Sequence, residues 1–328
     1  MNNTDASSKI SWLVIGPSPP PLGGVTVFIS RFVGRQRARG VNVRQAYPNS
    51  PLAALRFLSV ATQRPEIVII NSMRLPLLLA VFLFFPCSRK IIVDHNHSRK
   101  LAEASSKTGV KANLRWRFTK RLLNQFDRIW LVAPHLRNNY AQAGLSTKLT
   151  IINPFIAPDP SEYKSAVSQY SPGLRSLLRR DSEELIFAIS AYRLVDENGR
   201  DLYGFDLALH AMRALLDKGL KAKLVLFIAD PVQTTVYQNA KSLITTLNLS
   251  DHVLWEEGQK PLWPLFKTID AYLRPTQTDG WSVSIGEALA LNCSVIASDV
   301  VPRAKGCVLF NLNDVTALQN AMSLTIKR

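Results

Sequence analysis

The sequence predicts an α/β protein built from two doubly wound units in tandem, with a cleft between them. Short apolar runs rich in β-branched residues recur along the chain, and most are separated by enough residues to form a helix. This alternation lapses once, over 153–183, where four prolines fall. The chain of 328 residues is also longer than one usual domain. Each half is therefore expected to hold a mostly parallel sheet with helices on both faces.

The first unit is predicted over residues 1–155. A helix from about Val25 follows a proline-rich loop, and a second helix is expected in the apolar run 75–87, with Pro76 in its first turn. This run is shorter than the roughly 20 residues of a membrane-spanning helix. A buried core helix is the main interpretation, and a segment dipping into a membrane surface is the alternative. The predicted strands are 10–15, 41–46, 66–71, 90–94, 128–132 and 149–152.

A linker is predicted at 156–183, because prolines and polar residues replace the apolar runs there. The alternation then resumes, so residues 184–328 are predicted to form the second unit. Ligands of open α/β sheets bind beyond the carboxyl ends of the strands, which makes the residues after each strand candidates for a site. The predicted strands of this unit are 185–190, 222–229, 252–257, 269–275, 294–298 and 307–310.

The excess of positive charge is confined to the first half of the chain. Residues 1–155 hold 22 Lys and Arg against 5 Asp and Glu, a net charge of +17, whereas residues 156–328 hold 18 against 19, a net charge of −1. This asymmetry predicts an anionic partner for the first unit: a membrane leaflet, nucleic acid or an acidic substrate. A solvated basic surface without a partner is the alternative. Three widely spaced cysteines and a start without a secretory signal predict a cytoplasmic location.

The segment 105–126 is the most basic part of this half, with six Lys and Arg, no acid and interleaved aromatic residues. On a helix this pattern makes an amphipathic surface that suits anionic lipid headgroups. Nucleic acid is a second candidate partner, and packing of a plain amphipathic helix on the sheet is the third interpretation. The residues predicted at a membrane surface are Lys111, Arg115, Trp116, Arg117, Lys120 and Arg121.

Two candidate motifs follow strands of the first unit. Gly23 and Gly24 precede a helix, where paired glycines let a backbone approach a phosphate or sugar closely; a tight turn without a ligand is the alternative. The motif is not G-x-G-x-x-G, which disfavours a dinucleotide site. Asp94, His95 and His97 lie at the end of the fourth strand. With no further His or Cys group at ligand spacing, a hydrogen bond to a substrate hydroxyl is favoured over a metal site, and a structural role stays open.

Three charged residues stand out in the second unit. Arg193 follows a strand, where a guanidinium can clamp a diphosphate bidentately or make an ordinary surface ion pair. Asp279 and Glu287 are eight positions apart, and carboxylates suit the hydroxyl donors of a ribose and a sugar. The structural alternative is a capping box of Ser284 and Glu287, with a simple turn at Asp279.

At this point the residues resemble a family. The stretch RPTQTDGWSVSIGEALALNCSVIASDVVPR at 274–303 is similar to the signature of the retaining, GT-B-fold glycosyltransferases of group 1, a family of bacterial polysaccharide biosynthesis. The LGG loop, the strand end at His95, IINPFI at 151–156 and SAYRLV at 190–195 follow in the order that the family shows. The resemblance implies two Rossmann-like domains that face each other across a cleft.

The resemblance also implies roles for individual residues. Glu287 would bind the nucleotide ribose, Asp279 would contact the donor sugar, and Arg193 would stabilise the leaving diphosphate. Gly23 and Gly24 would line the cleft near the phosphates and the acceptor, and His95 would sit over the transferring sugar. The implied catalytic residues are thus His95, Asp279 and Arg193. Further donor-binding candidates are Gly280, Trp281, Ser282 and Val283. No metal and no cofactor is implied, because the nucleotide-diphosphate sugar is itself the donor substrate.

Two departures from the family bear on the site. Asp279 stands where the family usually has glutamate, which is one methylene longer. Tyr203 stands before Gly204 where the family usually has lysine, so a second cation for the diphosphate is missing there; Arg200 is a candidate replacement.

Together with this resemblance, the sequence predicts a metal-independent, retaining hexosyltransferase that acts in cell-surface polysaccharide synthesis. Its expected partners are a nucleotide sugar, a glycan or lipid-linked acceptor and an anionic membrane surface, with no nucleic acid. Its expected location is peripheral, on the inner face of the cell membrane. The alternative function is a non-catalytic GT-B-like subunit that binds glycan or a partner enzyme.

Overall fold

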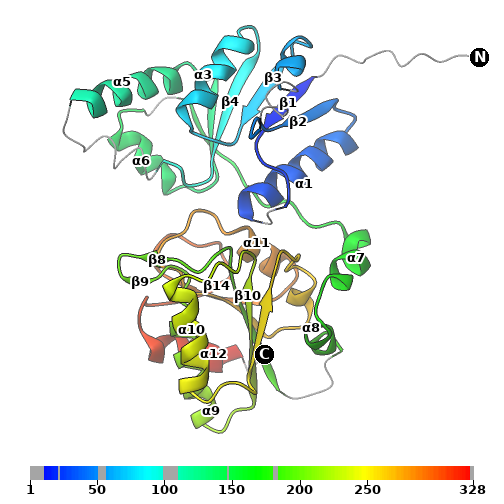
Figure 1. Ribbon diagram of the computed structural model, residues 1–328, viewed down its shortest axis with the longest axis vertical. Coiled ribbons are helices and arrows are strands. Elements are labelled where there is room, and N and C mark those ends of the chain that lie inside the picture. Colours follow the sequence, from blue (N-terminus) through cyan, green and yellow to red (C-terminus); the bar gives the residue numbers. More distant parts are fainter. Residues whose placement is uncertain are drawn as a thin grey trace, which may run out of the picture. The chain divides into compact units, whose positions relative to one another are not determined.

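The computed structural model describes residues 11–20, 23–50, 57–98, 110–145, 148–179 and 184–325, with only the backbone described for 110–113 and 115 (Figure 1). The chain divides into two compact units, which meet in sequence at Ile156 and Ala157; the second also includes Pro20–Gly24. Each unit contains a six-stranded parallel sheet. The predicted α/β class with two doubly wound units is confirmed.

The sheet of the first unit has the order β2-β1-β3-β4-β5-β6, and every pair in it is parallel. The strand order turns back at β1, as in doubly wound sheets, so sequence neighbours lie on both sides of the first strand. The strands are β1 (Trp12–Ile15), β2 (Val43–Ala46), β3 (Ile67–Ile70), β4 (Arg89–Asp94), β5 (Arg128–Leu131) and β6 (Leu149–Ile151). Its helices are α1 (Gly24–Ala38), α3 (Leu75–Phe84), α5 (Val110–Asn124) and α6 (Leu136–Gln142).

The sheet of the second unit has the order β11-β10-β7-β12-β13-β14, again all parallel. Its strands are β7 (Leu185–Ala191), β10 (Ala222–Ile228), β11 (Val253–Glu257), β12 (Ala271–Arg274), β13 (Ser294–Ser298) and β14 (Cys307–Phe310). Across both units each predicted strand is present, and its ends shift by at most two residues. A short antiparallel pair, β8 (Asp196–Glu197) with β9 (Arg200–Asp201), was not predicted.

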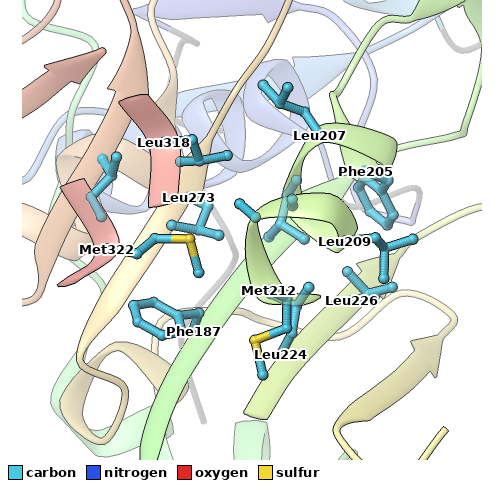
Figure 2. Packing of buried hydrophobic residues seen from close by; sticks show 14 of the residues in the cluster. Phe187, Phe205, Leu207, Leu209, Met212, Leu224, Leu226, Leu273, Leu318 and Met322 are labelled. Carbon is cyan, nitrogen blue, oxygen red and sulfur yellow. The ribbon is translucent and has the colours of Figure 1, made fainter. Parts of the chain in front are cut away.

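Alternate residues of the second sheet face two different cores, as the two-residue period of a strand requires. Phe187, Leu226 and Leu273 point into one core, which is covered by α9 (Phe205–Asp217), α10 (Thr235–Thr246) and α12 (Val315–Leu324) (Figure 2). Ala188, Phe227 and Tyr272 point into the other core, with Ile285 and Ala288 of α11 (Val283–Ala290). Burial on both faces explains why these strands read as continuous apolar runs.

The linker predicted at 156–183 is wrong over most of its length. The segment forms η1 (Pro160–Glu162), α7 (Tyr163–Ser168) and α8 (Pro172–Leu177). Ala166, Tyr170 and Leu174 are buried in the core of the second unit. The prediction failed because Pro160 and Pro172 lie in the first turns of helices. At that position the missing N–H of proline removes no intrahelical hydrogen bond.

The apolar helix α3 (Leu75–Phe84), predicted as a buried core helix, is buried on one side only. Pro76 lies in its first turn as predicted. Leu78 and Val81 are fully buried, whereas Leu79 and Phe84 are exposed and Leu83 is 72% exposed. Residues of an α-helix return to the same face about every 3.6 positions, so only one side of α3 can pack on the sheet. Because the sequence of α3 is apolar all round, its outer side is apolar as well. Among the described residues, no helix combines the length and the apolar character needed to cross a membrane.

Candidate functional site

The carboxyl ends of the second unit's strands bring charged side chains from four strands to one edge. Asp230 follows β10, Arg193 follows β7, Arg274 ends β12 and Arg303 comes after β13. Because parallel strands end at the same edge of a sheet, these residues lie where ligands of such folds bind.

Asp279 lies at the centre of a buried charge network. Its Oδ2 accepts hydrogen bonds from Arg274 Nε at 3.0 Å and Arg303 Nη1 at 2.7 Å, and its Oδ1 accepts from Arg274 Nη2 at 3.3 Å. Burial opposes ionisation of Asp279, but the charges and hydrogen bonds of the two arginines outweigh it and hold its pKa below the usual range. The carboxylate predicted to contact a donor sugar is thus already engaged by two guanidinium groups.

The two arginines of this network are fixed by further contacts. Arg303 donates from Nη2 to Thr276 Oγ1 and Ser298 Oγ, both at 3.0 Å. Arg274 donates from Nη1 to the Ser190 carbonyl at 3.3 Å, and its guanidinium lies 5.4 Å from the centroid of the Tyr203 ring. The network therefore ties the ends of β7, β12 and β13 together.

Arg193 makes the ion pair that was the structural alternative in its prediction. Its Nε donates to Asp230 Oδ2 at 3.0 Å, and its Nη2 contacts the same oxygen. The hydrogen bond that Arg193 donates to Asp230 is the main cause that raises the pKa of Arg193. The side chain of Arg193 is nevertheless exposed, so the remaining N–H groups of its guanidinium can still meet a ligand.

Helix α11 begins two residues earlier than the capping-box interpretation requires. Its N-cap is Ser282, whose side chain accepts from the Ile285 N–H at 3.4 Å. Ser284 lies inside the helix and hydrogen-bonds to Ser282 Oγ and Tyr272 Oη, both at 2.9 Å. Glu287, a buried residue of the second turn, therefore does not form a capping box with Ser284. The capping-box interpretation of Glu287 is therefore wrong.

The other donor-loop candidates lie between the network and this helix. The Gly280 N–H donates to Asp279 Oδ1 at 3.1 Å, and Val283 is buried at the helix start. The indole N–H of Trp281 is buried and makes no hydrogen bond within the described part of the chain. A buried donor of this kind usually has a partner, and a bound ligand is one way to supply it.

Arg200, the candidate for the missing cation, lies exposed on the β8–β9 hairpin. The next residue, Asp201, accepts from the backbone N–H groups of Tyr203 at 2.9 Å and of Phe205, the first residue of α9, at 2.7 Å. Burial raises the pKa of Asp201 to about 6 in spite of these two bonds. The structure thus places Tyr203 beside Arg274, whereas no contact brings Arg200 to Arg274 or Asp279 among the described residues.

In the first unit, His95 is held at the end of β4 by the neighbouring strand. His95 Nε2 lies 2.9 Å from Asn71 Oδ1, while Asn71 Nδ2 donates to the Ile15 carbonyl at 3.3 Å. Because that second bond fixes Oδ1 as the acceptor, Nε2 carries the proton and Nδ1 is left as an acceptor. Phe28 of α1 packs edge-on against the His95 ring, with centroids 5.0 Å apart.

The turn that carries His95 is shaped by Asp94. Oδ1 of this buried carboxylate accepts from the backbone N–H groups of Asn96 at 2.9 Å, His97 at 2.6 Å and Ser98 at 3.3 Å. Asp94 is therefore a structural residue of the turn. Gly24, a candidate on the neighbouring loop, forms the first residue of α1, directly after Gly23.

Acidic pH is expected to destabilise the protein through His95. Burial, with a smaller contribution from His97, lowers the pKa of His95 from its usual 6.5 to about 3. Between these values the unfolded state binds one more proton than the folded state, so stability falls as pH drops from 6.5 toward 3. Urea unfolding across pH 4–7 should show a shallower loss for His95→Gln, by up to about 1.4 kcal/mol per pH unit.

The control for this experiment is His210→Gln, since His210 is exposed on α9. The raised pKa of Asp201 gives the opposite slope between 3.8 and about 6, but it is common to all variants and cancels in the comparison. Equal slopes for His95→Gln and wild type would contradict a neutral buried His95.

The basic helix α5 presents both charged and apolar side chains to solvent. Arg117 and Arg121 are exposed, and Trp116 and Lys120 are half-buried. The side chains of the predicted membrane residues Lys111 and Arg115 lie outside the described part of the structure. Exposed Leu114 and Phe118 accompany the charges. Helix α5 packs beside α3, whose outer face is also apolar.

Three residues of the candidate sites were missed by the sequence analysis. Arg274 and Arg303 bracket the family-like stretch, but nothing in their spacing shows that both reach Asp279. Asn71 follows β3 directly, and its position after a buried strand was the available signal. Within the described residues, no group of three or more His, Cys, Asp or Glu side chains could hold a metal ion.

Comparisons with known proteins connect this geometry to a fold. The structure of Anabaena Alr3699/HepE in complex with UDP-glucose is similar, with a TM-score of 0.66 and 14% sequence identity. The similarity covers 96% of this chain and 90% of that one. The fold is GT-B. Sucrose-phosphate synthase from Thermosynechococcus elongatus (TM-score 0.68, 15% identity, 96% of this chain and 89% of that one) has a similar structure. So has WaaG, a glycosyltransferase involved in lipopolysaccharide biosynthesis (TM-score 0.62, 14% identity, 97% and 90%).

A family model matches part of the sequence. Residues 185–309 match the family model of Glycosyl transferases group 1. No curated protein matches the chain. The matched segment covers β7 to β14 and thus contains Arg193, Arg274, Asp279, Glu287 and Arg303.

Proposed function

We propose that this protein is a glycosyltransferase that takes its sugar from a nucleotide-diphosphate sugar. The observation that carries the proposal is the carboxyl edge of the second sheet, where Arg193, Arg274 and Arg303 gather. The buried carboxylate of Glu287 lies on α11, the helix that follows the Asp279 loop. Guanidinium groups bind phosphate oxygens bidentately, and a carboxylate accepts two hydrogen bonds from a ribose diol. The match of 185–309 to Glycosyl transferases group 1 covers this edge.

The chemistry proposed is retaining transfer without a metal or a cofactor, with a glycan or lipid-linked glycan as acceptor in cell-surface polysaccharide synthesis. The positive charge of Arg193 would stabilise the negative charge of the leaving diphosphate. His95, neutral and with Nδ1 as an acceptor, would take a hydrogen bond from a hydroxyl of the transferring sugar. The similarity to WaaG, a glycosyltransferase involved in lipopolysaccharide biosynthesis, supports a role in polysaccharide synthesis, and the UDP-glucose complex of Alr3699/HepE supports a nucleotide-sugar donor.

Calorimetric titration with UDP, GDP and their glucose conjugates tests this proposal. Binding of one nucleotide and its conjugate, followed by transfer to a lipid-linked acceptor, is the expected result. Binding without transfer across a wide acceptor panel would favour the non-catalytic subunit. That second candidate is supported by one observation: the acid at 279 is occupied by two arginines. Absence of nucleotide binding would overturn the first proposal.

We further propose that the protein acts at the inner face of the cell membrane, as a peripheral protein. Its support is the set of exposed leucines and two exposed phenylalanines on α3 and α5, which lie with exposed arginines of α5. The first half of the chain, which contains both helices, carries a net charge of +17, from 22 basic against 5 acidic residues. Each basic residue near an anionic leaflet contributes on the order of 1 kcal/mol, and buried apolar side chains add to it.

Vesicles that contain phosphatidylglycerol should therefore sediment the protein at low salt, less so at high salt. Leu83→Ser and the double variant Arg117→Glu/Arg121→Glu should each lower the bound fraction several-fold. Leu324→Ser is the control, because Leu324 is a similarly exposed leucine on α12 of the second unit. Absence of sedimentation at low salt, or an equal loss in the control, would contradict membrane binding through this face.

A further inference from the structure

We infer that Asp279 is a positioning residue, which acts by holding Arg274 and Arg303, and that Arg274 is a cation that contacts the donor's diphosphate. The inference rests on the proposed function. Its first support is that three hydrogen bonds from the two arginines occupy both oxygens of the Asp279 carboxylate. A carboxylate held in this way is a poor acceptor for the hydroxyl groups of a neutral sugar.

The charge balance at the sheet edge points to the anion that this network suits. Arg193 is matched by Asp230, whereas Asp279 faces two arginines and leaves a surplus of one positive charge. The surplus lies in a buried setting, where it is poorly screened by salt and attracts an anion strongly. A diphosphate supplies such an anion.

The two arginines differ in what they can reach. The side chain of Arg303 is 3% exposed and that of Arg274 is 14% exposed, so only Arg274 presents a surface to a ligand. Arg274 uses three of its five N–H groups, two toward Asp279 and one toward the Ser190 carbonyl. Its remaining two N–H groups make no hydrogen bond within the described residues.

The position of Arg274 also explains how the site can lack a lysine at position 203, where the chain has Tyr203. The guanidinium lies 5.4 Å from the centroid of the Tyr203 ring, so the positive charge absent from position 203 is present beside it. Arg193 follows Ser190 by three residues at the end of β7, and the Ser190 carbonyl accepts from Arg274. Arg274 thus reaches the strand end that carries the other diphosphate candidate, whereas Arg200 lies on the exposed hairpin.

Titration of variants with UDP, GDP and their glucose conjugates tests the inference. Arg274→Gln should weaken binding of the bare nucleoside diphosphate and of its conjugate by the same factor, about tenfold or more. Asp279→Asn should do likewise and should lower Tm by about 5 °C or more, because two buried guanidinium groups lose their counter-charge. If Asp279 instead binds the sugar, Asp279→Asn would weaken only the conjugate at an unchanged Tm, and the inference would be overturned.

A double variant keeps the test decisive if Asp279→Asn folds poorly. Asp279→Asn/Arg303→Met removes one charge of each sign and should recover part of the lost Tm, whereas additive losses would overturn the positioning role. The matched control is Asp217→Asn, since Asp217 pairs with Arg213 in an exposed pair on α9. Its Tm and nucleotide affinity should equal those of the wild type.

Failure of this inference is distinct from failure of the proposed function. If the wild type binds nucleotides and Arg274→Gln binds them equally well, Arg274 is not a diphosphate ligand while the proposed function stands. If the wild type binds none of the four compounds, the proposed function and the diphosphate role both fall. The Tm coupling between Asp279 and Arg303 still decides the positioning role in that case.

Discussion

Glu287→Ala is expected to lower the affinity for the nucleotide and its sugar conjugate by about 100-fold or more. Two hydrogen bonds between a charged acceptor and ribose hydroxyls account for a loss of this size. Glu287→Gln, which keeps one amide oxygen as an acceptor, should lose less. Calorimetric titration of both variants against the wild type provides the measurement.

The control for Glu287 is Glu184→Ala, which removes a carboxylate of the same unit that pairs with Lys223 at 3.2 Å. This variant should bind nucleotides as the wild type does. A capping role for Glu287 would instead show as a loss of stability without a specific loss of affinity. The position of Ser282 as the N-cap of α11 makes that second outcome the unexpected one.

Gly204→Ala is expected to cause the largest loss of stability of any single change considered for this protein. Gly204 has a φ of 70°, and an added Cβ would come within 2.4 Å of the Pro275 carbonyl oxygen. Left-handed strain and the clash with backbone together cost about 3 kcal/mol or more in the free energy of unfolding. The clash also pushes the start of α9 away from the loop that carries Asp279.

Gly219→Ala separates the two causes, since Gly219 has a φ of 79° and no atom within 4 Å of the added Cβ. It should cost only about 1 kcal/mol, the strain alone. Urea unfolding of both variants gives the comparison. Equal losses at the two positions would show that the approach of Gly204 to Pro275 does not limit stability.

The strands could be predicted from the sequence because both faces of each sheet are buried, which leaves runs of β-branched residues that end where polar residues begin. Which face of a helix is buried was harder to predict from the sequence. Leu79 and Leu83 look as apolar as Leu78, and only the position of the sheet decides which of them is exposed. The prediction of a linker at 156–183 failed for a related reason: in the sequence, a proline in the first turn of a helix cannot be distinguished from a proline in a linker.

The candidate site could be predicted as far as each residue depends on its own place in the chain. Arg193 comes just after a predicted strand, and Glu287 lies near the start of a predicted helix. Both placements could be predicted from the sequence. The engagement of Asp279 by Arg303 could not, because it joins residues 24 positions apart through the ends of two strands. Hydrogen-bond partners of this kind depend on the tertiary fold, which spacing alone does not encode.

The helices α7 and α8 also determine an order of events while the chain is being made. Between them, Tyr170 donates to the Pro261 carbonyl, 91 residues later, and Ser171, the N-cap of α8, hydrogen-bonds to Glu256, 85 residues later. Both helices leave the ribosome before any strand of the sheet that will bury them. At about 5–20 residues per second of synthesis, they wait several seconds or longer for that partner, with Leu174 exposed meanwhile. The start of the second unit thus completes its packing only after residues of β11 and the loop that follows it have been synthesised.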